Sequence, residues 1–153
     1  MHRMGTHQTG TIDEHLAHTE LCRELTPTQR REVADHATWM EMPAGTVLTR
    51  EGKAGSEFLI VLEGSVEIRV GGVAVATRGP GEVLGEISLL EACMRTATAV
   101  ATTPVFVGVM SKRDFWNLLG GVPAVQAMLM ATAAVRQAPI ADAPAHRSSF
   151  DIG

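Results

Sequence analysis

Between residues 46 and 110 the sequence consists of short strand-like segments that are separated by glycine-containing turns. The expected strands are residues 46–49, 57–62, 65–70, 73–77, 96–102 and 105–110. Residues 65–70 alternate apolar and polar side chains, as a strand with one buried face does. Gly71-Gly72 follows, and such a pair is typical of a hairpin turn. Strands this short and this closely spaced predict an antiparallel barrel or jelly roll.

Helical patterns lie on both sides of the expected strands. An uneven helical spacing of apolar residues covers 12–25, and Thr26-Pro27-Thr28-Gln29 has the capping residues of a helix that runs to about residue 37. Ser111 is a good N-cap for a second helix. After Gly120-Gly121, a last helix is expected over residues 123–137.

These elements predict one α+β, mainly β domain over residues 12–137, with about eight strands and flanking helices. Residues 1–11 are polar and are expected to be disordered, and residues 138–153, rich in Pro, Ala and Ser, to form a flexible tail. A net charge of −4 disfavours a nucleic-acid partner. The chain begins with no signal peptide, and residues 127–135 are too few to span a membrane, so a cytoplasmic protein is expected.

Residues 85–98 hold the best candidates for a binding site. Residues 86–91 have room for one or two helical turns, whose free N–H groups suit an anion. Gly85 allows the backbone to approach a ligand closely, and Arg95 adds a fixed positive charge. Glu86 is able to accept hydrogen bonds from ligand hydroxyl groups. Together these residues predict a site for a sugar phosphate.

The order of residues in this segment identifies a protein family more specifically than the chemistry of its side chains does. Gly85-Glu86-Ile87-Ser88-Leu89-Leu90, followed by Arg95-Thr96-Ala97-Thr98, resembles the phosphate-binding cassette of cyclic-nucleotide-binding domains. That family includes kinase regulatory subunits and the bacterial catabolite activator protein. Gly45-x-x-Leu48-x-x-Glu51-Gly52 also resembles its opening strands. The resemblance implies an antiparallel jelly-roll β-barrel with N-terminal helices, a short cassette helix and C-terminal helices. Because residues 139–153 are too few for a DNA-binding domain, we expect a stand-alone, bacterial-looking member without an output domain.

The resemblance assigns roles to eight residues. Arg95 would bind the cyclic phosphate, and Glu86 would accept the ribose 2′-hydroxyl. The other expected ligand contacts are Gly85, Ile87 and Ser88 through their main chain, Ser88 also through its hydroxyl, Ala97 through its N–H, Thr96 as the position that selects the base, and Met128 against the purine. Thr96 is equally suited to a strand, and the apolar stripe with Met128 is equally suited to packing on the barrel or on a second copy of the chain.

The expected function is that of a non-enzymatic sensor without a cofactor. It would bind cyclic AMP, or less favourably cyclic GMP, and signal through helix movement to a protein partner or a homodimer. One alternative is an interaction module of the same fold that does not bind nucleotide. A cupin-like metal enzyme is a weaker alternative, because no histidine lies between residues 37 and 145 to ligate a metal on the barrel. The histidines are His2, His7, His15, His18, His36 and His146.

Overall fold

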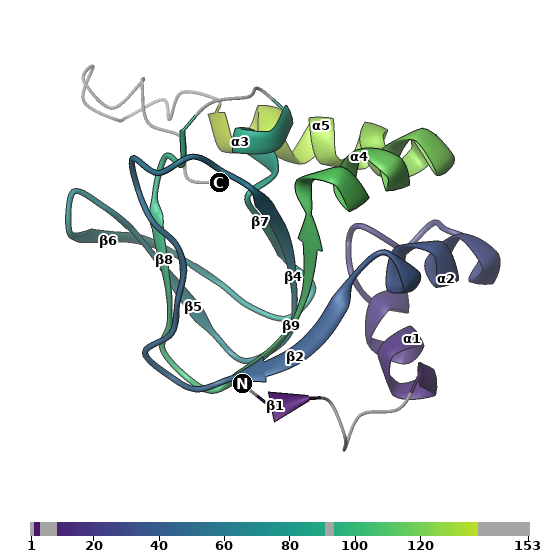
Figure 1. The fold of residues 1–153 in the computed structure, drawn as a ribbon, viewed down its shortest axis with the longest axis horizontal. Helices are drawn as coiled ribbons and strands as arrows, with labels where there is room; N and C mark the ends of the chain where they lie inside the picture. The colour runs from purple at the N-terminus through teal and green to yellow at the C-terminus, as the bar shows by residue number, and fades with distance from the viewer. Residues whose placement is uncertain (1, 4–8, 91–93, 138–153) are drawn as a thin grey trace.

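The computed structural model describes residues 2–3, 9–90 and 94–137, whose strands form two antiparallel sheets (Figure 1). In the five-stranded sheet, the order β1-β2-β9-β4-β7 joins β1 (His2–Arg3), β2 (Thr38–Met42), β9 (Val105–Ser111), β4 (Glu57–Glu63) and β7 (Val83–Leu84). In the four-stranded sheet, the order β3-β8-β5-β6 joins β3 (Val47–Thr49), β8 (Thr98–Ala101), β5 (Val66–Val70) and β6 (Val73–Arg78). The expected antiparallel jelly roll with flanking helices is thereby confirmed.

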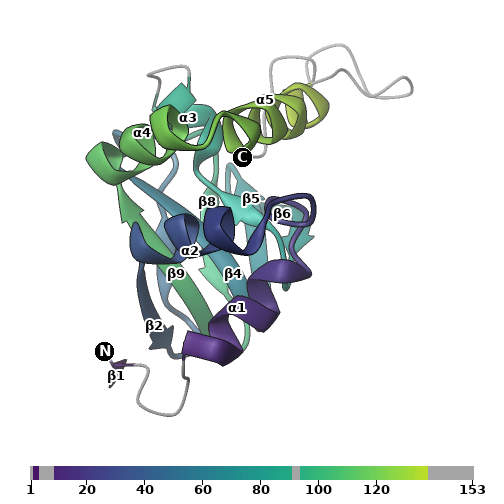
Figure 2. The same ribbon diagram turned by 90° about the vertical axis from the view of Figure 1, so that its right-hand side faces the viewer.

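The helices occupy two places around the sheets. They are α1 (Thr9–Ala17), α2 (Pro27–Asp35), α3 (Glu86–Leu90), α4 (Lys112–Gly121) and α5 (Pro123–Gln137). Figure 2 shows α1 and α2 against the five-stranded sheet, whereas α3, α4 and α5 lie together at one end of the barrel. Among the described residues no single helix has the length and apolarity to cross a membrane; α4 and α5 meet that test only as a pair, bent by 116°.

Local sequence signals set the starts of two helices, as predicted. Before α2, the Thr26 hydroxyl accepts a hydrogen bond from the Gln29 N–H at 3.2 Å, and the Gln29 side chain accepts from the Thr26 N–H at 2.9 Å. Pro27 occupies the first turn, where no N–H is needed. Before α4, the Ser111 hydroxyl accepts from the Asp114 N–H at 3.1 Å.

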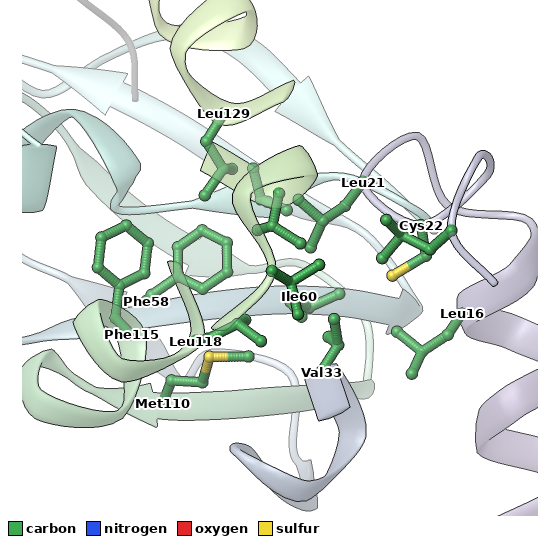
Figure 3. Close-up of a cluster of buried hydrophobic side chains, with 14 of the residues drawn as sticks. Leu16, Leu21, Cys22, Val33, Phe58, Ile60, Met110, Phe115, Leu118 and Leu129 are labelled. Atoms are coloured by element: carbon green, nitrogen blue, oxygen red, sulfur yellow. The ribbon is translucent and has the colours of Figure 1, made fainter. Parts of the chain in front are cut away.

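Strand β4, which lies between β9 and β7, is buried on both faces, which explains its unbroken apolar run. Phe58, Ile60 and Leu62 face the helices, in a cluster that we call the outer core (Figure 3). Leu59 and Val61 face the space between the two sheets, in a cluster that we call the inner core. The helices supply the outer core with Leu16, Val33, Phe115, Leu118 and Leu129, among others. These two cores fix β4, and with it the end of the barrel where α3 lies.

Strands β2 and β7 were not predicted from the sequence. β2 (Thr38–Met42) lies before residues 46–49, the first strand that the sequence pattern predicted. Trp39, on β2, pairs across the sheet with Gly108, and its ring fills the space that a side chain at 108 would need. β7 has only two residues, Val83 and Leu84, too few to show an alternating pattern.

The N-terminal part of the chain also differs from the expectation. Within residues 1–11, expected to be disordered, His2–Arg3 pair with β2 as strand β1, and α1 begins at Thr9. The helical pattern over 12–25 ends early, because α1 stops at Ala17. The Thr19 hydroxyl then donates to the Leu16 carbonyl at 2.7 Å and accepts from the Cys22 N–H at 3.1 Å, which stabilises turns instead of a helix. The expected tail, 138–153, lies outside the described residues.

Candidate functional site

Gly85 joins β7 to α3 in a conformation and a space that only glycine fits. Its φ of +90° lies in the region that side chains disfavour. A Cβ atom built there would collide with Nη1 of Arg95 and would lie 2.7 Å from the carbonyl oxygen of Glu57. The backbone of Gly85 therefore packs directly against the arginine that the sequence pattern had placed in the site.

Arg95 is buried beside Gly85, with 6% of the residue exposed. Its Nη2 donates to the Glu57 carbonyl oxygen, at the first residue of β4, over 2.6 Å. Its main chain is fixed as well: the Arg95 N–H donates to the Lys53 carbonyl at 2.7 Å, and the Gly52 N–H donates to the Arg95 carbonyl at 2.9 Å. Both ends of the residue are thus held. A guanidinium keeps its charge at all ordinary pH values, so this position is suited to an anion.

Glu86, the first residue of α3, carries a fully buried carboxylate. Its Oε2 accepts a hydrogen bond from Nη1 of Arg136 at 2.6 Å. Its Oε1 is buried and has no hydrogen-bond partner among the described residues. Burial raises the pKa of the Glu86 carboxyl, and the charges of Arg136 and Arg78 offset part of that rise. When the carboxyl group is ionised, Oε1 is a strong acceptor for a hydroxyl group of a ligand.

Two arginines beside Glu86 are not predicted by the sequence pattern. Arg136 lies in the last turn of α5, and only 10% of its side chain is exposed. Arg78 ends β6, and its Nε is buried without a hydrogen-bond partner in the described part of the chain. Burial lowers the pKa of Arg78, and the nearby Arg136 lowers it further. Since 50 positions separate Glu86 from Arg136, no local spacing connects the two residues.

Comparison with known proteins identifies the family. The model of the cyclic nucleotide-binding domain matches residues 39–121, a range that contains Gly85, Glu86 and Arg95. The chain belongs to this family. Arg136 lies beyond the matched range.

Relatives of this cyclic nucleotide-binding domain come from several kinds of regulator. The chain is 35% identical over 121 residues to a cAMP-dependent protein kinase regulatory subunit of Yarrowia lipolytica, which covers 77% of the chain and 32% of that protein. It is 30% identical over 123 residues to a cGMP-dependent protein kinase of Drosophila melanogaster, covering 80% of the chain and 10% of the kinase. The catabolite activator protein of Thermus thermophilus superposes with a TM-score of 0.70 at 28% identity, over 77% of this chain and 58% of that one. The chain thus spans about a third or less of these curated relatives.

In this cyclic nucleotide-binding domain, the residues after Arg95 are anchored to neighbouring loops before strand β8 begins at Thr98. The Ala97 carbonyl accepts from the Thr49 hydroxyl at 3.1 Å, and Ala97 is 4% exposed. The Thr96 hydroxyl oxygen is buried and has no hydrogen-bond partner among the described residues. The role of Thr96 in base selection stays a prediction. Strand β8 (Thr98–Ala101) is shorter than the strand predicted over residues 96–102.

The other predicted contacts are less defined by the structure. Ile87 and Ser88 lie in α3, and only their backbone is described, so the predicted Ser88 hydroxyl contact falls outside the described residues. Met128, on α5, is half-buried and packs against the outer core. That contact agrees with the alternative of packing on the barrel, and a contact with a purine stays a prediction. Within the described ranges, no cluster of three or more His, Cys, Asp or Glu residues is able to hold a metal ion.

Proposed function

We propose that this domain binds a 3′,5′-cyclic purine nucleotide, with cyclic AMP favoured over cyclic GMP. The observation that carries the proposal is the meeting of two buried charged groups, Arg95 and Glu86, at Gly85. Buried charges are costly unless they are paired and hydrogen-bonded. In a domain of this family, a cyclic phosphate would pair with Arg95, and a ribose hydroxyl would bond to Glu86.

The two charged groups suit the two ends of a ribose cyclic phosphate. Arg95 would neutralise the phosphate through charge-assisted hydrogen bonds, which are among the strong ones in proteins. Glu86 would accept the ribose 2′-hydroxyl at Oε1, the oxygen that no described residue uses. Gly85 carries no side chain, so the ligand would meet the backbone at the start of α3. Ile87, Ser88 and Ala97 would add main-chain contacts.

The proposed response to the ligand is a movement of the C-terminal helices. α5 is bonded to Glu86 through Arg136, so occupancy of the site acts on α5. A ligand shifts the position of a helix only through different affinities for its two positions. The proposed recipient of the signal is a protein partner or a second copy of the chain, in the cytoplasm, with neither catalysis nor a cofactor. The kinase regulatory subunits among the relatives support a signalling role.

Titration calorimetry with cyclic AMP and cyclic GMP tests the proposal. The variants are Arg95→Ala and, as a matched control, Arg31→Ala, which changes an exposed arginine on α2. Removal of one partner of a buried charged contact costs about 2–5 kcal/mol, so Arg95→Ala is expected to weaken binding by about 30-fold or more. The control is expected to bind like the wild type. If the wild type gives no heat with either nucleotide, the proposal is refuted.

A further inference from the structure

The C-terminal helix reaches the ligand site through one ion pair. Nη1 of Arg136 lies 2.6 Å from Oε2 of Glu86; 10% of the Arg136 side chain is exposed, and the Glu86 side chain is fully buried. The two carboxylate oxygens are therefore in different situations. Oε2 is bonded to α5, whereas Oε1 has no partner among the described residues. A pair of this kind favours the ionised carboxylate and fixes the direction of the free oxygen.

A buried carboxylate without such a partner would bind a proton more readily. Burial already raises the pKa of Glu86, and Arg136 is the largest influence that opposes the rise. Arg78 also opposes it, through its charge and without a hydrogen bond to Glu86. Of these two guanidinium groups, Arg136 is the one that bonds directly to Glu86, so it helps to orient the carboxylate. Its place in α5 lies outside the residues matched by the family model.

We infer that Arg136 is a positioning residue for recognition of the ribose hydroxyl. By holding Oε2, it orients the carboxylate and leaves Oε1 directed to accept a hydrogen bond from a hydroxyl group of the ligand. This inference rests on the proposed function. It concerns only the sugar end of the ligand, because the phosphate end depends on Arg95, which is anchored separately to the Glu57 carbonyl. Since Arg136 belongs to α5, hydroxyl binding and docking of α5 favour each other by the same factor.

The test compares the affinities of cyclic AMP and its 2′-deoxy counterpart, measured by calorimetry. The quantity of interest is the ratio of the two dissociation constants. A hydrogen bond to a charged group contributes about 1.5–3 kcal/mol, so the wild-type ratio is expected to be about ten- to a hundredfold. In Arg136→Met the ratio is expected to fall to within about threefold of one, with little change in affinity for the 2′-deoxy nucleotide. Arg113→Met, an exposed arginine on α4, is the matched control and should keep the wild-type ratio.

A purely structural role for Arg136 gives a different result. Both nucleotides would then lose affinity equally, the ratio would stay at its wild-type value, and the inference would be overturned. Retained binding of the 2′-deoxy nucleotide shows that the variant is folded. If the Met variant does not fold, Arg136→Lys keeps the charge but loses the planar donor fork. A lowered ratio in that variant supports the inference, and a wild-type ratio overturns it. Failure of the proposed function is distinct, because the wild type would then bind neither nucleotide.

Discussion

Gly85→Ala perturbs the site while leaving every charged group in the chain. A residue with a Cβ atom in the left-handed region costs roughly 1–2 kcal/mol. The new methyl group would also lie 2.7 Å from the Glu57 carbonyl oxygen and collide with Nη1 of Arg95. Relief of that collision displaces the guanidinium from Glu57, and a hydrogen bond of this charged kind is worth about 1.5–3 kcal/mol. The free energy of unfolding should therefore fall by about 3 kcal/mol or more.

Gly45→Ala is the matched control, because its backbone is nearly the same and its surroundings are open. Gly45 has φ of +92°, and a Cβ there meets no atom within 4 Å. Only the backbone strain of about 1–2 kcal/mol is expected, with nucleotide affinity unchanged. Urea denaturation gives the two stability losses, and calorimetry gives the two affinities. Equal losses of stability, together with wild-type affinity in Gly85→Ala, would refute the reasoning that Arg95 depends on the missing side chain at 85.

Two further predictions concern pH and the outer core. Because the folded state raises the pKa of Glu86 above its ordinary value near 4.5, stability from this group is present below that value and is lost as pH rises through the raised pKa. Ligand affinity should change in the opposite direction, rising with pH as Glu86 ionises. Arg136 and Arg78 are the charged groups that face Glu86. Glu86→Gln should abolish both pH trends, as measured by melting and binding curves at matched pH values. Gly108→Ala should lower stability by about 1–3 kcal/mol, since its methyl group would overlap the Trp39 ring. A thermal melt checks that loss, and unchanged nucleotide affinity is expected; a wild-type melting temperature would contradict the packing argument.

Much of the fold is encoded in local signals that can be recognised without a structure. Short strands with glycine at the turns predicted the antiparallel jelly roll, and the capping residues before α2 and α4 placed two helix starts. Gly85, Glu86 and Arg95 were predicted to share one site because they lie within one short segment, which has suitable side chains and resembles a known motif. The structure brings these three residues together. Their contacts with a ligand stay a prediction.

The features that were not predicted depend on contacts between distant parts of the chain. Strand β7 is defined by its pairing with β4, because two residues carry no periodic pattern. Arginine is common in the last turn of a solvent-exposed helix, so the sequence around Arg136 gave no indication of its contact with Glu86. For Met128 the sequence left two interpretations open, because an apolar residue on α5 suits packing in a core and contact with a ligand equally well. In the structure, Met128 contacts the outer core.

A peptide carbonyl, that of Glu57, helps to hold the Arg95 guanidinium in place. Any amino acid at position 57 presents that same oxygen, so evolutionary change there leaves the anchor intact. What protects it instead is the pairing of β4 with β9, in which Glu57 is opposite Ser111. Disruption of that strand pair would loosen the arginine, whereas substitutions of the side chains around the site would not reveal this support.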